Sequence, residues 1–570
     1  MEETRRAGLP RPRLRLALVA TLLLAAPCAA GAAGIDPEAA LARAASARRL
    51  ATRAERVGSR ECVDRYYEGA VFAFAAMTAD PDPDSRRCGR AVALYNQNLA
   101  DCLRSATCHR ALDPRSRLLV RSPRGVIVVP IVHRGFVWSP ADFHQLLDPA
   151  AAPRNPSNQR RHAREGVGAT QVVRRQNPHA TADDAFLPEP MFFPATAVLR
   201  PDLDAWCGGA GGPGDVLEFH DPLRVSQVAP TGASWTLASD LDAPIAYLEE
   251  ATGGLQSGWS GLLNPSQDVD RAFLGMLEPY QPGKIPLIFV HGLYDTPYTF
   301  TDLMNSLRSI PGFLDRYQII GYRYATGLTF LHSAALFRRD LHRFEAAFDP
   351  SRSDPGLQNT VLLGHSMGGL LIKLQIVSSG RALWNLVANR PLESLALAEA
   401  ARAFLADLFF FEPVPFVRRV VFLATPHDGL GVAAQPGGVI SERLTRRPED
   451  LRALVPQVER DNPGAIKPYM YGLPNSIGML RRREPVHQVM RCLPVNPNVR
   501  LHTIAGTAKV PAAVAHGDGA VPIASAHHPG AESETLVPEF HTTMNSSDFT
   551  LVEVDRILRR HVATAPVSGR

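Results

Sequence analysis

The hydrophobic positions in the second half of the chain alternate between short continuous runs and runs with helical spacing. Mostly apolar runs at 285–290, 360–363 and 419–423 have the length and composition of buried strands. After the second of these runs, apolar residues recur over 370–377 with the spacing of one helix face. A final amphipathic pattern at 549–561 predicts another helix. This half of the chain is therefore predicted to combine strands and helices.

The first half divides into two patterns. Over 36–110, apolar residues such as Tyr67, Val71 and Phe74 share one face of a predicted helix. Apolar stretches at 117–137 and 216–220 instead predict strands. We expect a helical segment followed by a small β-rich module.

Long loops are expected within that module. Residues 150–184 are rich in Arg, Asn, Pro and Ala, and they predict a long surface loop. The glycine-rich stretch 207–214 lacks the strand–helix frame that a phosphate-binding loop needs. It is therefore interpreted as a turn.

Residues 1–34 have the three parts of an export signal: five arginines, the apolar stretch 16–26 and then small residues. The apolar stretch is shorter than the ~20 residues that span a bilayer. We expect an exported protein that is periplasmic, associated with the outer membrane or secreted. Cys28 lies where a lipoprotein cysteine would, although Pro27 and Ala25 depart from the usual lipobox. Two outcomes stay open: cleavage beyond Cys28, which the pattern favours, and lipidation at Cys28 with anchoring to the membrane.

Six cysteines follow Cys28, and four of them fall within 62–108. Their spacing does not match a zinc site, and six cysteines allow 15 pairings. In an oxidising compartment, disulfides between short helices are expected. Buried free thiols are the alternative.

The overall composition changes this picture little. The net charge of +5 is small for 570 residues, and 45% of them are hydrophobic, which is ample for a packed core. The basic run 481–483 is typical of a solvated face. Nothing in the charge pattern predicts binding to nucleic acid.

The most specific motif is Gly364-His365-Ser366-Met367-Gly368, which lies between the predicted strand at 360–363 and the helical pattern that follows. A serine in Gly-x-Ser-x-Gly at such a junction occupies a sharp turn, where flanking side chains would clash with the backbone. The turn exposes the hydroxyl for attack on an acyl carbon. Ser366 is therefore the candidate nucleophile.

The loop after the strand at 285–290 reads His291-Gly292-Leu293. A tetrahedral oxyanion needs two N–H donors, one of which normally belongs to the residue after the nucleophile. We expect these donors to be the backbone amides of Met367 and Leu293. His291 is a candidate pocket residue.

Two carboxylates are candidates for the group that orients a catalytic histidine. Asp518 follows a predicted late strand, and Asp428 follows the strand at 419–423. Asp518 is preferred, because Asp428 adjoins a proline-containing loop that is expected to wall the pocket. The alternative for Asp518 is an ordinary Asp-Gly turn.

The candidate general base is His541, which lies between the last apolar stretch and the final helix. The order Ser366, Asp518, His541 is the chain order of a triad mounted on this kind of sheet. His527 and His528 are interpreted as loop residues. His427 is a candidate either for lining the pocket or for bonding the backbone beneath it.

Together these motifs resemble an α/β-hydrolase of the lipase and esterase group, over residues 284–562. Within it, the chain resembles large bacterial exported or lipoprotein-type hydrolases. The resemblance implies an α/β fold with a mostly parallel sheet, a Ser-His-Asp triad and neither a metal nor a cofactor. We therefore expect the α/β-hydrolase catalytic domain at 284–562, after a signal region (1–34), a helical cysteine-containing segment (35–116) and a β-rich accessory module with long loops (117–283), and before a tail (563–570).

An insertion at 381–416 contains a helical pattern that ends in Phe409, Phe410 and Phe411. These aromatics are interpreted either as a lid that contacts an acyl chain or as the core of a cap.

The sequence predicts an exported serine hydrolase that cleaves a small-molecule or lipid ester through an acyl-enzyme. Three alternatives stay open: an acyltransferase, a peptidase with the same triad, and a surface or binding protein without turnover.

Overall fold

The structure is a computed structural model. It describes residues 36–564 except 81, 83, 123–124, 155–157, 177–180, 208–213, 254–271, 431–448, 483 and 510–515. The predicted signal region, Cys28 and nearly all of the predicted tail lie outside the described residues. The chain forms two compact units: residues 1–111, 118–130 and 199–217 make the first, and residues 112–117, 131–198 and 218–570 make the second. Among the described residues, no helix is both long and apolar enough to cross a membrane.

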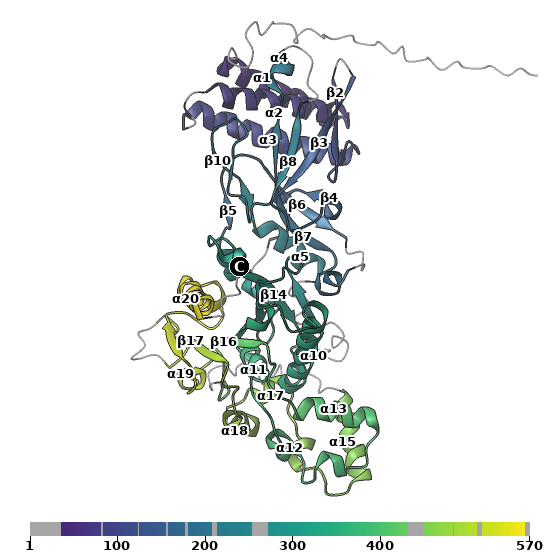
Figure 1. The fold of residues 1–570 in the computed structure, drawn as a ribbon, viewed down its shortest axis with the longest axis vertical. Helices are drawn as coiled ribbons and strands as arrows, with labels where there is room; N and C mark the ends of the chain where they lie inside the picture. Colours follow the sequence, from purple (N-terminus) through teal and green to yellow (C-terminus); the bar gives the residue numbers. More distant parts are fainter. Residues whose placement is uncertain are drawn as a thin grey trace, which may run out of the picture. The chain divides into compact units, whose positions relative to one another are not determined.

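Three helices lie side by side in the first unit: α1 (Pro37–Arg56), α2 (Glu61–Ala79) and α3 (Arg86–Cys108) (Figure 1). The side chains of Asp36 and Ser85 accept hydrogen bonds from backbone N–H groups in the first turns of α1 and α3, which defines where both helices begin. On α2, Tyr67 and Phe74 are buried as the helical pattern predicts. The predicted helical segment is confirmed.

The expected disulfides between these helices are not supported. Cys62, Cys88, Cys102 and Cys108 are all free thiols, and so is Cys492 in the second unit. The helices already bury a continuous apolar contact, in which Cys102 donates to the carbonyl of Val63 at 3.6 Å. A buried cysteine in such a setting acts as a small hydrophobic residue. The alternative of buried thiols holds for three of these four cysteines.

A seven-stranded sheet has the order β1-β2-β3-β8-β7-β6-β4, in which β6 is antiparallel to both β7 and β4. Its strands are β1 (Leu112–Asp113), β2 (Arg117–Ser122), β3 (Gly125–Arg134), β4 (Gln145–Leu147), β6 (Ala169–Arg175), β7 (Met191–Arg200) and β8 (Val216–His220). The predicted strands at 117–137 and 216–220 are therefore present.

The single long loop expected at 150–184 was wrong, because β6 lies within it. The charge of Arg175 suggested an exposed loop. In the structure its guanidinium is buried between Asp142 and Asp184, 2.7 Å from each carboxylate. The two ion pairs compensate the buried charge, so the position is compatible with a strand that packs on both faces.

Within the second unit, polar contacts join Arg160 and His162 to residues of three helices. His162 contacts Asp242 through Nδ1 and Ser306 through Nε2, at 3.0 Å each. Asp242 begins helix α5 (Asp242–Ala251), and Ser306 lies on helix α8 (Thr301–Arg308). Arg160 pairs with Asp548 at 2.6 Å.

The second sheet has the order β12-β14-β13-β15-β16-β17-β18. Strand β12 is antiparallel to β14, and all the other neighbours are parallel. The strands are β12 (Phe273–Met276), β13 (Ile285–Val290), β14 (Tyr317–Arg323), β15 (Thr360–His365), β16 (Val417–Leu423), β17 (Arg500–Gly506) and β18 (Ser533–Val537). Strands β13 and β15 are buried throughout because helices cover both faces of the sheet.

Alternate residues of these strands face two helical layers. Leu287 and Phe289 share a core with Leu307 of α8 and with Ile557 of α20 (Asp548–Thr564). On the other side, Tyr322 packs against Phe337 of α10 (Phe330–Phe348), with ring centroids 4.3 Å apart. Figure 1 shows this sheet with α10, α11 (Met367–Lys373) and α20 around it. The predicted α/β-hydrolase fold is confirmed.

The last helix is fixed to the sheet by a buried hydrogen bond, in which the Tyr317 hydroxyl donates to the carbonyl of Leu558 at 2.8 Å. The loop between β18 and α20 carries His541. Anchoring α20 therefore limits where that loop can lie.

Shorter helices follow α11 and complete the unit. They are α12 (Ala382–Val387), α13 (Glu399–Phe409), α15 (Glu449–Asp461), α16 (Pro468–Tyr471), α17 (Ser476–Met479), α18 (Pro485–Cys492) and α19 (Ile523–Ala526).

Thiol labelling tests the burial of the cysteines. A maleimide should modify the exposed Cys108 and Cys492 of the native protein roughly tenfold or more faster than Cys62 and Cys102, because a buried thiol reacts only when the structure opens. Burial also raises the pKa of Cys102, which removes the reactive thiolate. Peptide mass spectrometry identifies the labelled sites, and a cross-linked peptide joining Cys62 to Cys102 would contradict the assignment.

Candidate active site

Ser366 occupies a sharp turn between β15 and α11, with φ at 54° and ψ at −122°. Positive φ is costly for a residue with a Cβ, so neighbouring contacts must impose it. A Cβ added at Gly364 would lie 2.7 Å from the backbone of Gly368, and one at Gly368 would lie 2.2 Å from the carbonyl oxygen of Val290. Only glycine fits at both positions, as the motif predicts.

The structure brings Ser366, His541 and Asp518 together. The Ser366 hydroxyl lies 3.0 Å from Nε2 of His541, and Nδ1 of His541 lies 2.8 Å from the Asp518 carboxylate. Because the carboxylate can only accept, Nδ1 carries the proton and Nε2 is left to accept from the serine. This is the geometry of a nucleophile, a base and an orienting group.

Asp518 is buried but remains ionised. Burial alone would raise its pKa, but the hydrogen bond and the charge of His541 and two backbone N–H groups outweigh burial and lower it below the ordinary value. The second carboxylate oxygen accepts from Ala520 at 2.9 Å and from Val521 at 2.7 Å. The carboxylate therefore has a fixed orientation toward the imidazole.

Two residues that sequence reasoning missed hold the histidine loop. Nε2 of His365 donates to the carbonyl of His541 at 3.1 Å, and Nδ1 of His365 lies 3.4 Å from the amide nitrogen of Asn545. Burial lowers the pKa of His365 to about 3, so its ring is neutral and can accept and donate at once. The signal was its place directly before the serine; nothing in the sequence marks Asn545.

The loop predicted to supply an oxyanion donor lies against the nucleophile. A Cβ added at Gly292 would be 3.1 Å from Cβ of Ser366, so Leu293, the next residue, also lies close to it. The Tyr324 hydroxyl donates to the carbonyl of His291 at 2.8 Å, and the two rings stack with centroids 4.4 Å apart. His291 is fully buried and supports the loop from beneath.

Met367 is the first residue of α11, so its backbone N–H belongs to the unpaired first turn of a helix. A helix N-terminus also favours negative charge. The amide of Met367 thus has the properties that an oxyanion donor needs.

Asp295 is a further acidic group near the histidine that the sequence did not mark. Burial raises its pKa to about 6, although hydrogen bonds from Thr296 and Thr299 and, to a smaller extent, the nearby His541 lower it. Its carboxylate accepts from the backbone N–H of Thr296 at 2.9 Å.

Two candidate residues from the sequence, Asp428 and His427, do not take part in the hydrogen bonds that join Ser366, His541 and Asp518. Asp428 pairs with Arg491 at 3.1 Å. His427 is buried with its ring edge-on to Phe422, at 4.7 Å between centroids, and burial lowers its pKa well below the ordinary value. His427 is therefore a neutral residue of the interior.

The three phenylalanines lie at the end of α13. Phe409 and Phe410 contact Trp384 of α12, with centroids 5.6 and 5.7 Å apart. Phe411 lies beneath the guanidinium of Arg338, 3.9 Å from its ring centroid. Phe409 is 1% exposed and Phe411 is 9% exposed, so their packing favours the core interpretation over the lid.

No group of three or more His, Cys, Asp or Glu side chains that could hold a metal ion occurs among the described residues.

Several solved structures are similar to part of this chain. A lipase of Bacillus licheniformis in its mature form has 16% identity and a TM-score of 0.29, over 49% of this chain and 93% of the lipase. Esterase B of Lactobacillus rhamnosis has 13% identity and a TM-score of 0.30, over 55% of this chain and 96% of the esterase. A metagenomic carboxyl esterase has 15% identity and a TM-score of 0.27, over 50% of this chain and 77% of that chain.

No family model matches the sequence, and a search of curated proteins gives no match. The chain thus resembles lipase and esterase structures over about half of its length. The fold assignment itself rests on the order and register of the sheet.

The two candidate carboxylates can be separated by substitution. Asp518→Asn should lower kcat for an ester about 10⁴-fold, because an asparagine would favour the wrong histidine tautomer. Asp428→Asn is the matched control and should stay within about tenfold of the parent, since it changes only a partly exposed ion pair. A larger loss in Asp428→Asn than in Asp518→Asn would refute the assignment.

A second substitution tests the packing of α13. Phe409→Ala should lower the free energy of unfolding by about 3–5 kcal/mol, the usual cost of removing a buried aromatic ring. Its effect on activity should be equal for short-chain and long-chain esters. Urea titration measures the first quantity, and the ratio of kcat/KM values measures the second. Phe549→Ala, at a position that is 56% exposed, is the control. A selective loss on long-chain esters would instead support the lid.

Proposed function

We propose that this protein is an exported serine hydrolase that cleaves carboxylic esters. The hydrogen-bonded chain from Asp518 through His541 to Ser366 carries the proposal. The pattern of residues 1–34 supports export.

In the proposed reaction, Oγ of Ser366 attacks the ester carbonyl carbon while Nε2 of His541 takes the hydroxyl proton. The tetrahedral oxyanion accepts hydrogen bonds from the backbone amides of Leu293 and Met367. The intermediate collapses, the bond to the leaving alkoxy group breaks, and His541 returns its proton to that group. An alcohol leaves and the acyl group remains on Ser366.

Water then completes the cycle. His541 accepts a proton from the water as its oxygen attacks the acyl carbon, and it returns that proton to Ser366 when the acid leaves. Asp518 stays ionised throughout and stabilises the imidazolium form in both halves of the cycle.

The nucleophile is tested with an activity-directed label. A fluorophosphonate should add covalently to Ser366 in the full-length protein, and Ser366→Ala should lose both the label and hydrolysis, the latter by about 10⁴-fold or more. Ser351→Ala, at an exposed serine, is the control. Retention of more than a tenth of the activity, or a label on another residue, would refute the assignment.

The class of reaction is tested separately. Hydrolysis of p-nitrophenyl esters of graded acyl length should exceed hydrolysis of the matching anilides. Product analysis with an added acceptor alcohol distinguishes a hydrolase from an acyltransferase, because a transferase would form the new ester even when water is in excess.

A further inference from the structure

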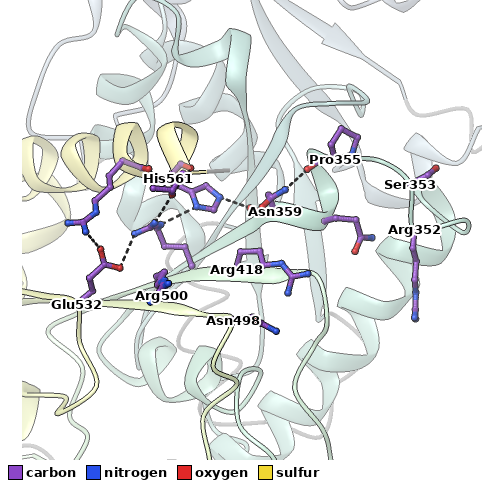
Figure 2. Close-up of a pocket in the computed structure, with 13 residues that line it drawn as sticks. Arg352, Ser353, Pro355, Asn359, Arg418, Asn498, Arg500, Glu532 and His561 are labelled. Atoms are coloured by element: carbon purple, nitrogen blue, oxygen red, sulfur yellow. Dashed lines mark hydrogen bonds and ion pairs between the residues drawn. The ribbon is translucent and has the colours of Figure 1, made fainter. Parts of the chain in front are cut away.

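A cavity of about 990 Å³ lies at the amino ends of β15, β16 and β17 (Figure 2). Ser366 follows the carboxyl end of β15. The six residues of that strand, at about 3.3 Å each, separate the two places by roughly 17–20 Å. The cavity is therefore distinct from the candidate active site.

Five arginines line the cavity, against one carboxylate, Glu532. Figure 2 shows Arg418 and Arg500 on neighbouring strands, with Glu532 to one side and Arg352 to the other. Arg352 is paired outside the cavity with Glu345, at 3.2 Å. Of the other four, Arg419 and Arg560 have ion pairs with Glu532, and Arg418 and Arg500 have no ion pair with any described lining residue. Among the described lining residues, four arginines thus stand against one carboxylate.

Arg419 is the buried arginine of the cavity lining, with a side chain that is only 2% exposed. Its Nε donates to Nδ1 of His561 at 3.1 Å, and another of its nitrogens contacts Nε2 of His502. Glu532 lies 4.0 Å away and is also paired with Arg560. The guanidinium is thus oriented mainly by imidazoles and not by carboxylates.

Both imidazoles are neutral. Burial, helped by the charge of Arg419, lowers the pKa of His561 to about 4 and that of His502 to about 3. Nε2 of His561 donates to the carbonyl of Asn359 at 2.8 Å, which leaves Nδ1 to accept from Arg419. A neutral ring can fix the position of a guanidinium but cannot balance its charge. Buried charges in proteins are normally paired, so the buried guanidinium of Arg419, which lies 4.0 Å from Glu532, favours a further anion from outside the chain.

We propose that the cavity binds an anion that carries phosphoryl groups. A guanidinium offers paired N–H donors in one plane, which match two oxygens of a phosphoryl group and give short, charge-assisted hydrogen bonds. Several guanidiniums around one space suit an anion of two or more charges. The volume is in the range of small-ligand sites, so the site fits a small phosphoester or diphosphate as well as a phospholipid headgroup.

Binding is tested on the full-length protein by calorimetric titration with inorganic pyrophosphate. In parallel, the protein is sedimented with phosphatidylcholine vesicles that either contain or lack phosphatidylglycerol. The double variant Arg418→Gln/Arg500→Gln should weaken binding at least tenfold, because it removes two charge-assisted contacts. Arg559→Gln is the matched control, since Arg559 is exposed on α20 and pairs with Asp555.

Arg419→Gln is a second variant, and its melting curve shows whether it folds. Fluorophosphonate labelling of Ser366 should be unchanged in the double variant, because the two sites lie at opposite edges of the sheet.

Arginine-dependent binding of pyrophosphate would support the proposal with a soluble ligand. Binding only to vesicles that contain phosphatidylglycerol, lost in the double variant, would support it with a lipid headgroup. Equal weakening in Arg559→Gln would overturn it, because any surface charge would then act alike. Absence of binding to both probes would also overturn it.

Discussion

The close approach of three backbone segments around Ser366 is the constraint on which the candidate active site depends. Strand β15, the start of α11 and the end of β13 meet where Gly364 and Gly368 leave no room for a side chain. This packing imposes the positive φ of Ser366 and brings Gly292 against the serine. A strained residue persists only where its surroundings determine its conformation, and here the apolar core of the sheet does so.

The same sheet separates two electrostatic environments. At its carboxyl edge, the ionised Asp518 accepts a hydrogen bond from the imidazole of His541 and orients it. At its amino edge, guanidiniums gather around a cavity with too few carboxylates. Because the sheet interior is apolar, the two edges can carry different chemistry without sharing side chains.

The sequence predicted those elements whose pattern is compatible with a single structure. The apolar runs of β13 and β15 can only be buried strands at that length, and a glycine-flanked serine between a strand and a helix has few alternatives. Strand β6 was missed because Arg175 looks solvent-exposed in sequence, and only Asp142 and Asp184, which lie apart from one another in the chain, explain its burial. The clustered cysteines led to a wrong prediction of disulfides, because these cysteines pack between helices as free thiols and are not cross-linked.

Within the site, residues that act through a side chain were easier to predict than residues that position others. The structure joins Ser366, His541 and Asp518 by hydrogen bonds, and their catalytic roles stay a prediction. The roles of His365 and Asn545 depend on contacts across 176 and 180 residues of sequence, which no local pattern reveals. The aromatic end of α13 is ambiguous in sequence, because a lid and a core both require apolar side chains.

Because α20 anchors the loop that carries His541, the order in which the chain is synthesised decides when this loop can be fixed. Synthesis proceeds from the N-terminus, and folding generally follows domain by domain. The nucleophile and its turn can form early, but His541 is made 175 residues later and its loop is held between β18 and the last helix. A nascent chain that ends before α20 can contain both Ser366 and His541, but it lacks the helix to which Tyr317 anchors the loop that carries His541.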